Sequence, residues 1–350
     1  MFHCVYTALS LYCVVYSGVW VYMCICICVC VHISCLYIPA VVNIANMISS
    51  HLYERFQDPL NDLASTRNME IRAAAHYLDF IQGSNIVRIS REHLIYAVGI
   101  IESFHHYFSA VASQPFSGYN LVDYSTGKYQ TVRGFDLMPI YFPSFAEPMS
   151  TTESYLDFAR ILPGSTVLDL GAYAGHTSII FKELAGAYGR VVALDADPQN
   201  IRAIRKNFQL YSTIRNHGID LVYGAIWRHG QGIAFSSESN MGSSAAEIVG
   251  SGRGHDLVVP SFTLTSLAAR VSLTSVDFIK CDVEGAESAV FEDAEFFAKF
   301  RPRILVETHM VGGASTAERV TQLLTSYGYT CRPVELHQIA GLPILECTPN

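Results

Sequence analysis

The fold of this chain is decided by the stretch Ser165-Thr-Val-Leu-Asp-Leu-Gly171-Ala-Tyr-Ala-Gly175. The residues before Gly171 have the short apolar pattern of a buried strand, and Gly171 and Gly175 bound a turn. From Ser178 to Leu184, apolar residues recur at helical spacing. A strand, a glycine turn and a helix bring a ligand close to the backbone and to a helix N-terminus. The stretch therefore predicts a ligand-binding α/β unit.

A second unit of the same kind follows directly. Val191 to Leu194 form an apolar run that ends in Asp195, and Asp197 before a proline is typical of a helix start. A carboxylate at the end of this strand can accept hydrogen bonds from both hydroxyls of a ribose. The glycine turn lacks the G-x-G-x-x-G pattern that binds a dinucleotide pyrophosphate. We therefore expect S-adenosylmethionine, with Asp169 facing its cationic amino-acid part directly or through water.

Two later strands are predicted to bring acid and base groups to the same edge of the sheet. The apolar run Val276–Lys280 precedes Asp282 and Glu284, and the run Ile304–Val306 precedes His309. Ligands bind at the carboxyl ends of strands in an open α/β sheet. Histidine is the usual choice for a base that acts near neutral pH. We expect these three side chains to be catalytic, although a structural role for the histidine stays open.

The predicted cofactor site draws on all of these strand ends. A third strand that starts at Asp220 runs into Ala225, whose backbone could border the adenine. The expected cofactor-binding residues are Asp169, Gly171, Ala172, Gly175, Asp195, Ala225 and Asp282. Nothing in the sequence demands a metal, although the three catalytic candidates could assemble a cation site.

The four motifs together resemble the FkbM family of methyltransferases. They are Asp169–Ser178, Ala193–Pro198, Phe278–Glu287 and Val306–His309, and the resemblance spans about residues 147–334. It implies a doubly wound, mostly parallel, seven-stranded class I (Rossmann-like) sheet, dependence on S-adenosylmethionine, and O-methylation of a hydroxyl on a sugar, glycan or natural product. Two positions depart from the family pattern. Tyr173 stands where Asn or Asp is common, and Asp195 stands where Glu is common.

The remaining chain divides into three parts before the methyltransferase domain of residues 161–350. Residues 47–114 are predicted to be a helical extension, with apolar spacing from Ile71 to Ile81 and an N-cap at Ser90. Residues 115–160 are predicted to hold a hairpin and a lid or linker. In the hairpin, residues 120–122 pair with residues 129–132. The aromatic segment up to Glu147 is either a substrate wall or a linker packed on the domain.

Residues 1–46 form a hydrophobic, cysteine-rich segment. No Asp, Glu, Lys or Arg precedes Glu54, and seven of the ten cysteines lie between Cys4 and Cys35. The segment is long enough to span a bilayer but lacks a basic flank. Three interpretations stay open. The segment is a gene-model artefact with the true start at Met47, a membrane anchor, or a loosely structured tail.

The overall composition limits the partners. The net charge is -8, and no basic cluster is present that would bind nucleic acid. A small-molecule or glycan acceptor is therefore expected. The isolated Cys281, Cys331 and Cys347 indicate buried, reduced thiols and a cytoplasmic location, or a membrane-anchored one if residues 1–46 are translated. The alternatives are an NAD-dependent oxidoreductase and a non-catalytic, membrane-anchored binding protein with the same fold.

Overall fold

The computed structural model describes residues 12–16, 19–23, 53–237, 243–245, 248, 255–334 and 344–350. The chain divides into two compact units, Met1–Ala45 and Asn46–Asn350. In the first unit, β1 (Tyr12–Tyr16) and β2 (Val19–Met23) form an antiparallel hairpin. The rest of the segment 1–46 lies outside the described residues, so its three interpretations stay open. Within the described ranges, no helix combines the length and the apolar character needed to cross a membrane.

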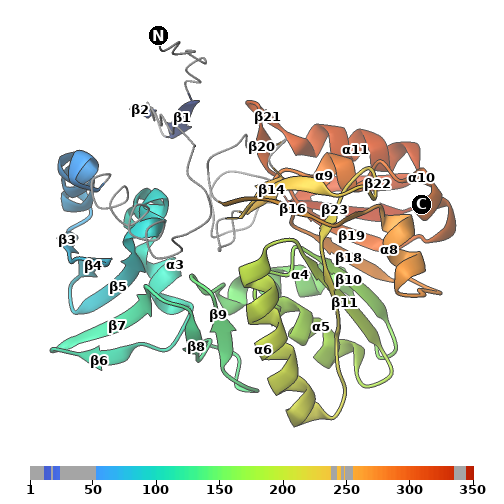
Figure 1. The fold of residues 1–350 in the computed structure, drawn as a ribbon, viewed down its shortest axis with the longest axis horizontal. Coiled ribbons are helices and arrows are strands. Elements are labelled where there is room, and N and C mark those ends of the chain that lie inside the picture. The colour runs from blue at the N-terminus through green and yellow to red at the C-terminus, as the bar shows by residue number, and fades with distance from the viewer. Residues whose placement is uncertain are drawn as a thin grey trace, which may run out of the picture. The chain divides into compact units, whose positions relative to one another are not determined.

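A seven-stranded sheet forms the core of the C-terminal part of the larger unit (Figure 1). Its strands are β10 (Thr166–Leu170), β11 (Arg190–Asp195), β12 (Asp220–Tyr223), β18 (Phe278–Cys281), β19 (Arg303–Glu307), β22 (Tyr329–Val334) and β23 (Ile344–Pro349). They lie in the order β12-β11-β10-β18-β19-β23-β22. Neighbours from β12 to β19 are parallel, whereas β23 is antiparallel to both of its neighbours. The predicted doubly wound, mostly parallel, seven-stranded sheet is confirmed, and an antiparallel pair of strands closes it.

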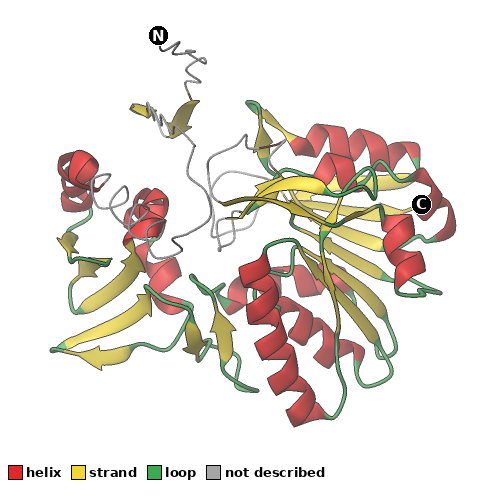
Figure 2. Ribbon diagram, viewed as in Figure 1, coloured by secondary structure: helices red, strands yellow, loops and turns green. Residues whose placement is uncertain are grey.

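Helices cover both faces of this sheet (Figure 2). They are α4 (Met149–Ala159), α5 (His176–Ala185), α6 (Pro198–Arg215), α8 (Leu264–Arg270), α9 (Glu287–Val290), α10 (Ala294–Lys299) and α11 (Thr316–Ser326). Successive strand residues point to opposite faces. Val167 and Phe278 therefore pack with α4 and α5, while Leu168 and Ile279 pack with α8, α10 and α11. Burial on both faces explains why these strands are almost continuously apolar.

The region before this domain is a mixed α/β module. It contains a helix over residues 53–66, β3 (Glu70–Ala73), β4 (Tyr77–Gln82), β5 (Asn85–Ser90), η1 (Arg91–Tyr96), α2 (Ala97–Glu102), α3 (Phe104–Ser109), β6 (Gln114–Phe116), β7 (Tyr119–Tyr124), β8 (Lys128–Gln130) and β9 (Ile140–Phe142). The strands β3 to β7 form a five-stranded sheet in the order β3-β4-β5-β7-β6. Helices do occur at both ends of the predicted helical extension, but strands replace its middle.

The predicted helix from Ile71 to Ile81 is wrong. β4 and β5 form an antiparallel hairpin, in which Gln82 pairs with Asn85 across a two-residue turn. Gly83 in this turn has a φ of +59°, which favours glycine. The following residues of β5 are rich in β-branched side chains, which pack well in a sheet. The N-cap at Ser90 is confirmed, because its side chain accepts a hydrogen bond from the Glu92 backbone at 3.3 Å.

The predicted hairpin between residues 120–122 and 129–132 is also wrong. Both strands exist, but β7 pairs with β5 and β6, and β8 pairs with β9. Val122 and Tyr124 of β7 are buried in the same core as Val87 and Ile89 of β5. Pairing with the distant β5 therefore buries apolar surface that a local hairpin would leave exposed.

Two smaller features complete the domain. The expected third strand over residues 220–227 is interrupted at Gly224 and continues as β13 (Ala225–Ile226), which pairs with β17 (Ser261–Phe262). A small sheet follows in the order β15-β14-β16, and a short hairpin lies after β19. These strands are β14 (Ile233–Ser237), β15 (Ser244–Ala245), β16 (His255–Val259), β20 (Met310–Val311) and β21 (Ala314–Ser315).

The cysteine prediction is wrong for two of the three residues. Cys331 on β22 lies directly opposite Cys347 on β23, and the two form a disulfide. Their separation of 16 residues in the sequence is bridged by the strand register. Cys281 at the end of β18 is a buried, free thiol, as expected.

Candidate functional site

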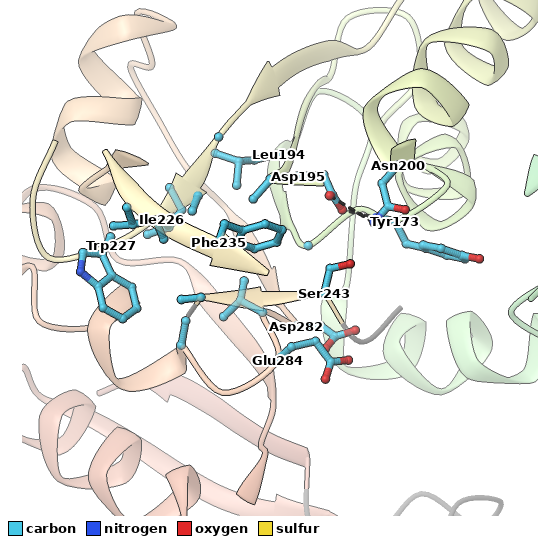
Figure 3. Close-up of a pocket in the computed structure, with 18 of the residues that line it drawn as sticks. Tyr173, Leu194, Asp195, Asn200, Ile226, Trp227, Phe235, Ser243, Asp282 and Glu284 are labelled. Carbon is cyan, nitrogen blue, oxygen red and sulfur yellow. Dashed lines mark hydrogen bonds between the residues drawn. The ribbon is translucent and has the colours of Figure 1, made fainter. Parts of the chain in front are cut away.

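A cavity opens at the carboxyl ends of β10, β11 and β18 (Figure 3). The space between its walls, including the part open to solvent, is about 640 Å³. Four of the predicted cofactor-binding residues line it, namely Gly171, Asp195, Ala225 and Asp282, together with the catalytic candidate Glu284. The three residues Asp169, Ala172 and Gly175 do not line it.

One end of the cavity is built around Asp195. Its carboxylate accepts hydrogen bonds from the backbone N–H groups of Tyr173 and Asp197, each at 2.8 Å, and from Asn200 Nδ2 at 3.2 Å. Burial raises the pKa of this carboxyl to about 7, although these hydrogen bonds oppose the rise. Next to it the wall is apolar and is formed partly by Phe235. A fixed carboxylate beside an apolar wall suits a nucleoside, whose ribose donates hydroxyls and whose base is flat and weakly polar.

The glycine turn has two different steric requirements. Gly171 has a φ of +79°, and a Cβ added there would lie 1.7 Å from the carbonyl oxygen of Asp282. This glycine therefore allows the ends of β10 and β18 to approach each other beside the cavity. A Cβ on Gly175 would instead meet the ring of Phe208 at 2.7 Å. Gly175 thus serves the packing of α5 against α6, and it is not among the residues that line the cavity.

Tyr173, the unusual residue of this turn, points away from the cofactor end. Its side chain is buried, and its hydroxyl donates to the carbonyl oxygen of Phe145 at 2.6 Å and lies 3.1 Å from Ser144 Oγ. Its ring also stacks with Phe142 at a centroid distance of 6.2 Å. The substitution of Tyr for a small polar residue thus ties the glycine turn to the segment that precedes the domain.

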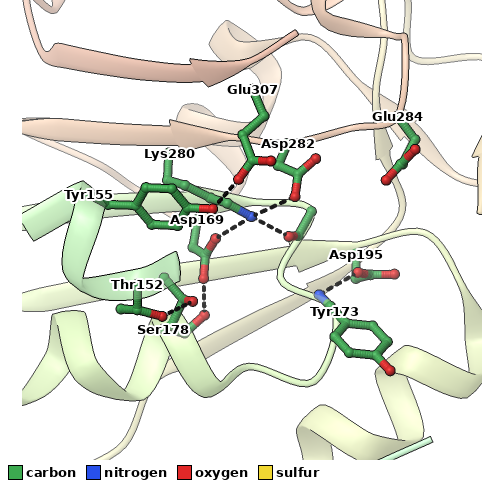
Figure 4. A network of polar contacts seen from close by, with 12 residues as sticks. Thr152, Tyr155, Asp169, Tyr173, Ser178, Asp195, Lys280, Asp282, Glu284 and Glu307 are labelled. Carbon is green, nitrogen blue, oxygen red and sulfur yellow. Dashed lines mark hydrogen bonds and ion pairs between the residues drawn. The ribbon is translucent and has the colours of Figure 1, made fainter. Parts of the chain in front are cut away.

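Lys280 organises a buried polar network at the other end (Figure 4). Its Nζ donates to the carbonyl oxygen of Gly171 at 2.8 Å and lies 3.4 Å from Asp282 Oδ2 and 3.7 Å from Asp169 Oδ1. Asp169 is fully buried and also accepts a hydrogen bond from Ser178. Asp169 therefore supports the lysine rather than contacting a ligand directly. Burial disfavours the charged lysine, but the carboxylates around it raise its pKa overall.

The structure brings the three predicted catalytic residues together. His309 Nε2 lies 3.7 Å from Asp282 Oδ1 and 3.6 Å from Glu284 Oε2. His309 Nδ1 lies 2.8 Å from the fully buried carboxylate of Glu287, which also accepts the backbone N–H of Gly285 at 2.9 Å. Potential ligand atoms of the three residues all lie within 4.8 Å of one another, so they could also hold a cation. Glu287 therefore orients the imidazole of His309. Its position in the first turn of α9 by itself suggests only an acid that the helix dipole favours.

The charge states of this cluster are strongly coupled to its burial. Burial lowers the pKa of His309, but the hydrogen bond to Glu287 and the nearby acids outweigh it and raise the pKa to about 10. Burial raises the pKa of Glu284 to about 8, with the charge of His309 opposing the rise. Glu284 also has a φ of +52°, which is rare for a residue with a side chain and is found at functional sites. The surrounding acids thus favour the protonated imidazole of His309, and burial favours the protonated carboxyl of Glu284.

Three further residues of the site were not predicted. Lys280 had a signal, since a lysine that ends an apolar strand is unusual inside a sheet. Glu307 accepts a hydrogen bond from Tyr155, and burial raises its pKa to about 7. Glu147 lines the cavity from the segment before α4. Glu307 lies inside the motif Val306–His309, and Glu147 ends the segment expected to be a substrate wall or a linker, so the sequence indicated their neighbourhood but not their role.

The sequence matches one protein family. Residues 169–331 match the family model described as the Methyltransferase FkbM domain. The match begins at the glycine turn and ends on β22, so it covers Asp195, Asp282, Glu284 and His309. It leaves Glu147 and the N-terminal module outside. Comparison with curated proteins gave no match.

Solved structures show a distant likeness. A methyltransferase FkbM from Methylobacillus flagellatus KT is 14% identical, with a TM-score of 0.40, and the alignment covers 57% of this chain and 48% of that one. Fibrillarin from Aeropyrum pernix, with natively bound S-adenosyl-L-methionine, is 15% identical, with a TM-score of 0.38 and coverages of 63% and 87%. An O-methyltransferase from Bacillus cereus in complex with SAH is 13% identical, with a TM-score of 0.35 and coverages of 57% and 80%.

Proposed function

We propose that this chain, in which residues 169–331 form a methyltransferase FkbM domain, transfers the methyl group of S-adenosylmethionine to an acceptor hydroxyl. When bound, this cofactor supplies a methyl group on a positively charged sulfur. Asp195 would hold the ribose hydroxyls, and the wall beside Ala225 would take the adenine. Gly171 and Asp282 would border the methionine part, since both line the same cavity.

The observation that carries this proposal is the sharing of one cavity by two kinds of group. Asp195, which suits a nucleoside, and Asp282 with Glu284, which suit proton transfer, line the same space. A dinucleotide oxidoreductase would need the absent pyrophosphate turn. A non-catalytic binding protein would have no use for the costly burial of several acids around His309.

Glu284 is the favoured proton acceptor of the predicted catalytic trio. An imidazole that is already protonated cannot take a proton, and the pKa of His309 is about 10. The Glu284 carboxylate can accept the hydroxyl proton, because its raised pKa brings it close to the working pH. His309, held by Glu287, would then keep Asp282 and Glu284 in place and balance their charge.

The charge of the chain and of the cavity supports an uncharged acceptor. The chain has a net charge of -8, and an acidic cluster lines the cavity, so an anionic acceptor such as RNA would be repelled. A neutral small molecule or glycan fits this surface. The disulfide Cys331–Cys347 argues against the expected cytoplasmic location, because disulfides are rare in reducing compartments.

Calorimetry and isotope transfer test the proposal together. We expect S-adenosylhomocysteine (SAH), the form of the cofactor left after methyl transfer, to bind to the purified chain. We expect NAD to show no binding. We expect a labelled methyl group from S-adenosylmethionine to appear on a neutral hydroxyl compound in a metabolite or glycan extract, detected by mass spectrometry. Binding of NAD instead of SAH would support the oxidoreductase. Binding of SAH without transfer to any extract component would support the non-catalytic alternative.

A further inference from the structure

Glu147 enters the cofactor cavity from outside the matched domain. It lies between β9 and α4, yet it lines the same cavity as Gly171, Asp195 and Asp282. Every other lining residue falls within residues 169–331. The segment that precedes the methyltransferase domain therefore contributes a carboxyl group to its cavity.

The backbone around Glu147 is held firmly. Phe145, two residues earlier, is fully buried and packs against the rings of Tyr96 and Tyr124 at centroid distances of 5.0 and 5.4 Å. Tyr173 fixes the carbonyl oxygen of Phe145 by a hydrogen bond of 2.6 Å. Glu147 is therefore presented to the cavity by a rigid segment, which lowers the entropic cost of using it to bind a ligand.

The carboxylate of Glu147 differs from its acidic neighbours in having no partner. No described residue forms a hydrogen bond or an ion pair with it. By contrast, Asp169 is held by Ser178, Glu307 by Tyr155, and Asp282 by Lys280. An unpaired carboxylate in a partly enclosed cavity is costly unless a ligand supplies the missing donor or positive charge.

The surrounding charge calls for a cation. Asp169, Asp282 and Glu307 act electrostatically on Glu147 together with a single ammonium group, that of Lys280. Counting Glu147 itself, four carboxyl groups thus surround one ammonium group. A sulfonium carries charge but no N–H, whereas an α-ammonium group offers three donors to a carboxylate. Of the two, only the ammonium group can satisfy an unpartnered carboxylate oxygen.

We infer that Glu147 binds the α-ammonium group of S-adenosylmethionine, so that the segment between β9 and α4 completes the cofactor site of the methyltransferase domain. The inference rests on the proposed function. It identifies the residue that distinguishes the full amino-acid part of the cofactor from the nucleoside alone.

Calorimetry with SAH and with its deaminated analogue tests this inference. SAH retains the α-ammonium group, and its deaminated analogue lacks it. We expect the wild-type chain to bind SAH about 10- to 100-fold more tightly than the analogue, the range of a charged hydrogen bond. Glu147→Gln should bind SAH about as weakly as the analogue, while its affinity for the analogue stays unchanged. Glu153→Gln, an exposed position on the nearby α4, should behave as wild type.

The failures of this test are distinguishable. If Glu147→Gln still prefers SAH over the analogue by the wild-type ratio, the inference is overturned and the proposed function stands. If the wild-type chain binds SAH no better than its analogue, the inference is likewise overturned. If the wild-type chain binds neither compound, the proposed function fails and takes the inference with it. Near-ultraviolet circular dichroism establishes that each variant is folded before binding is measured.

Discussion

The two ends of the cavity hold their carboxylates in opposite ways. At the nucleoside end, Asp195 receives hydrogen bonds from three N–H donors close to it in the sequence or in the adjacent turn. At the acid end, Glu284 has only the imidazole of His309, at 3.6 Å, and Glu147 has no partner among the described residues. A carboxylate satisfied before the ligand arrives provides binding geometry. An unsatisfied one is available for a cation or a proton.

The largest expected effect comes from the acid end. Glu284→Gln removes the proposed proton acceptor, so we expect kcat to fall about 100-fold or more, the scale of general-base catalysis. The affinity for SAH, measured by calorimetry, should stay within about threefold of wild type, because SAH binding needs no proton transfer. Glu295→Gln, exposed on α10, is the matched control. Loss of SAH binding with an intact rate would exchange the roles of the two ends.

A substitution at the nucleoside end should have the opposite effect, with weaker cofactor binding and a nearly unchanged kcat. Asp195→Ala removes the proposed partner of the ribose hydroxyls, so we expect SAH affinity to fall about 10- to 100-fold. The value of kcat at saturating S-adenosylmethionine should change much less. Asp157→Ala, an exposed aspartate on α4, controls for the change in charge. An unchanged dissociation constant in Asp195→Ala would remove this residue from the cofactor site.

A substitution in the glycine turn should change the stability of the fold without changing the affinity for the cofactor. Gly175→Val places atoms against Phe208, so we expect a loss of about 1–3 kcal/mol in the free energy of unfolding, as for other overpacked cores. SAH affinity of the folded fraction should be nearly unchanged. Gly218→Val, which adds atoms to open space, should leave stability close to wild type. Lost SAH binding with normal stability would return Gly175 to the cofactor site.

The acid end should also make the rate depend on pH. Glu284 acts only when deprotonated, and its pKa is raised to about 8, so kcat/KM should rise with pH through the neutral range and level off above about 8. Below that value, kcat/KM should fall about tenfold with each pH unit. His309 stays protonated over this range and adds no opposing limb. A kcat/KM profile for the acceptor that is flat between pH 6 and 8, measured at saturating S-adenosylmethionine, would exclude Glu284 as the base.

Chelation should have the smallest effect. His309 supplies positive charge between Asp282 and Glu284, where a metal ion would otherwise sit. We therefore expect activity after dialysis against EDTA to equal that of untreated protein. A loss of activity that Mg²⁺ or Mn²⁺ restores would show that the cluster of these three residues is a metal site.

The sequence alone determined the parts of this protein that depend on neighbouring residues. The strand, turn and helix around Gly171, the position of Asp195 after the next strand, and the apolar runs that end near Asp282 and His309 are all local patterns. Strands that are buried on both faces leave a clear apolar signal. The order of such units in a parallel sheet then follows from general rules of connection.

Tertiary structure decided whatever depends on segments that are distant in the sequence. The pairing of β7 with β5, the disulfide between Cys331 and Cys347, and the entry of Glu147 into the cavity all follow from strand order and register. The protonation of His309 likewise depends on Glu284 and Glu287, which a different strand brings beside it. Side-chain pattern specifies which surface of a segment is buried, but only the folded chain specifies what is buried against it.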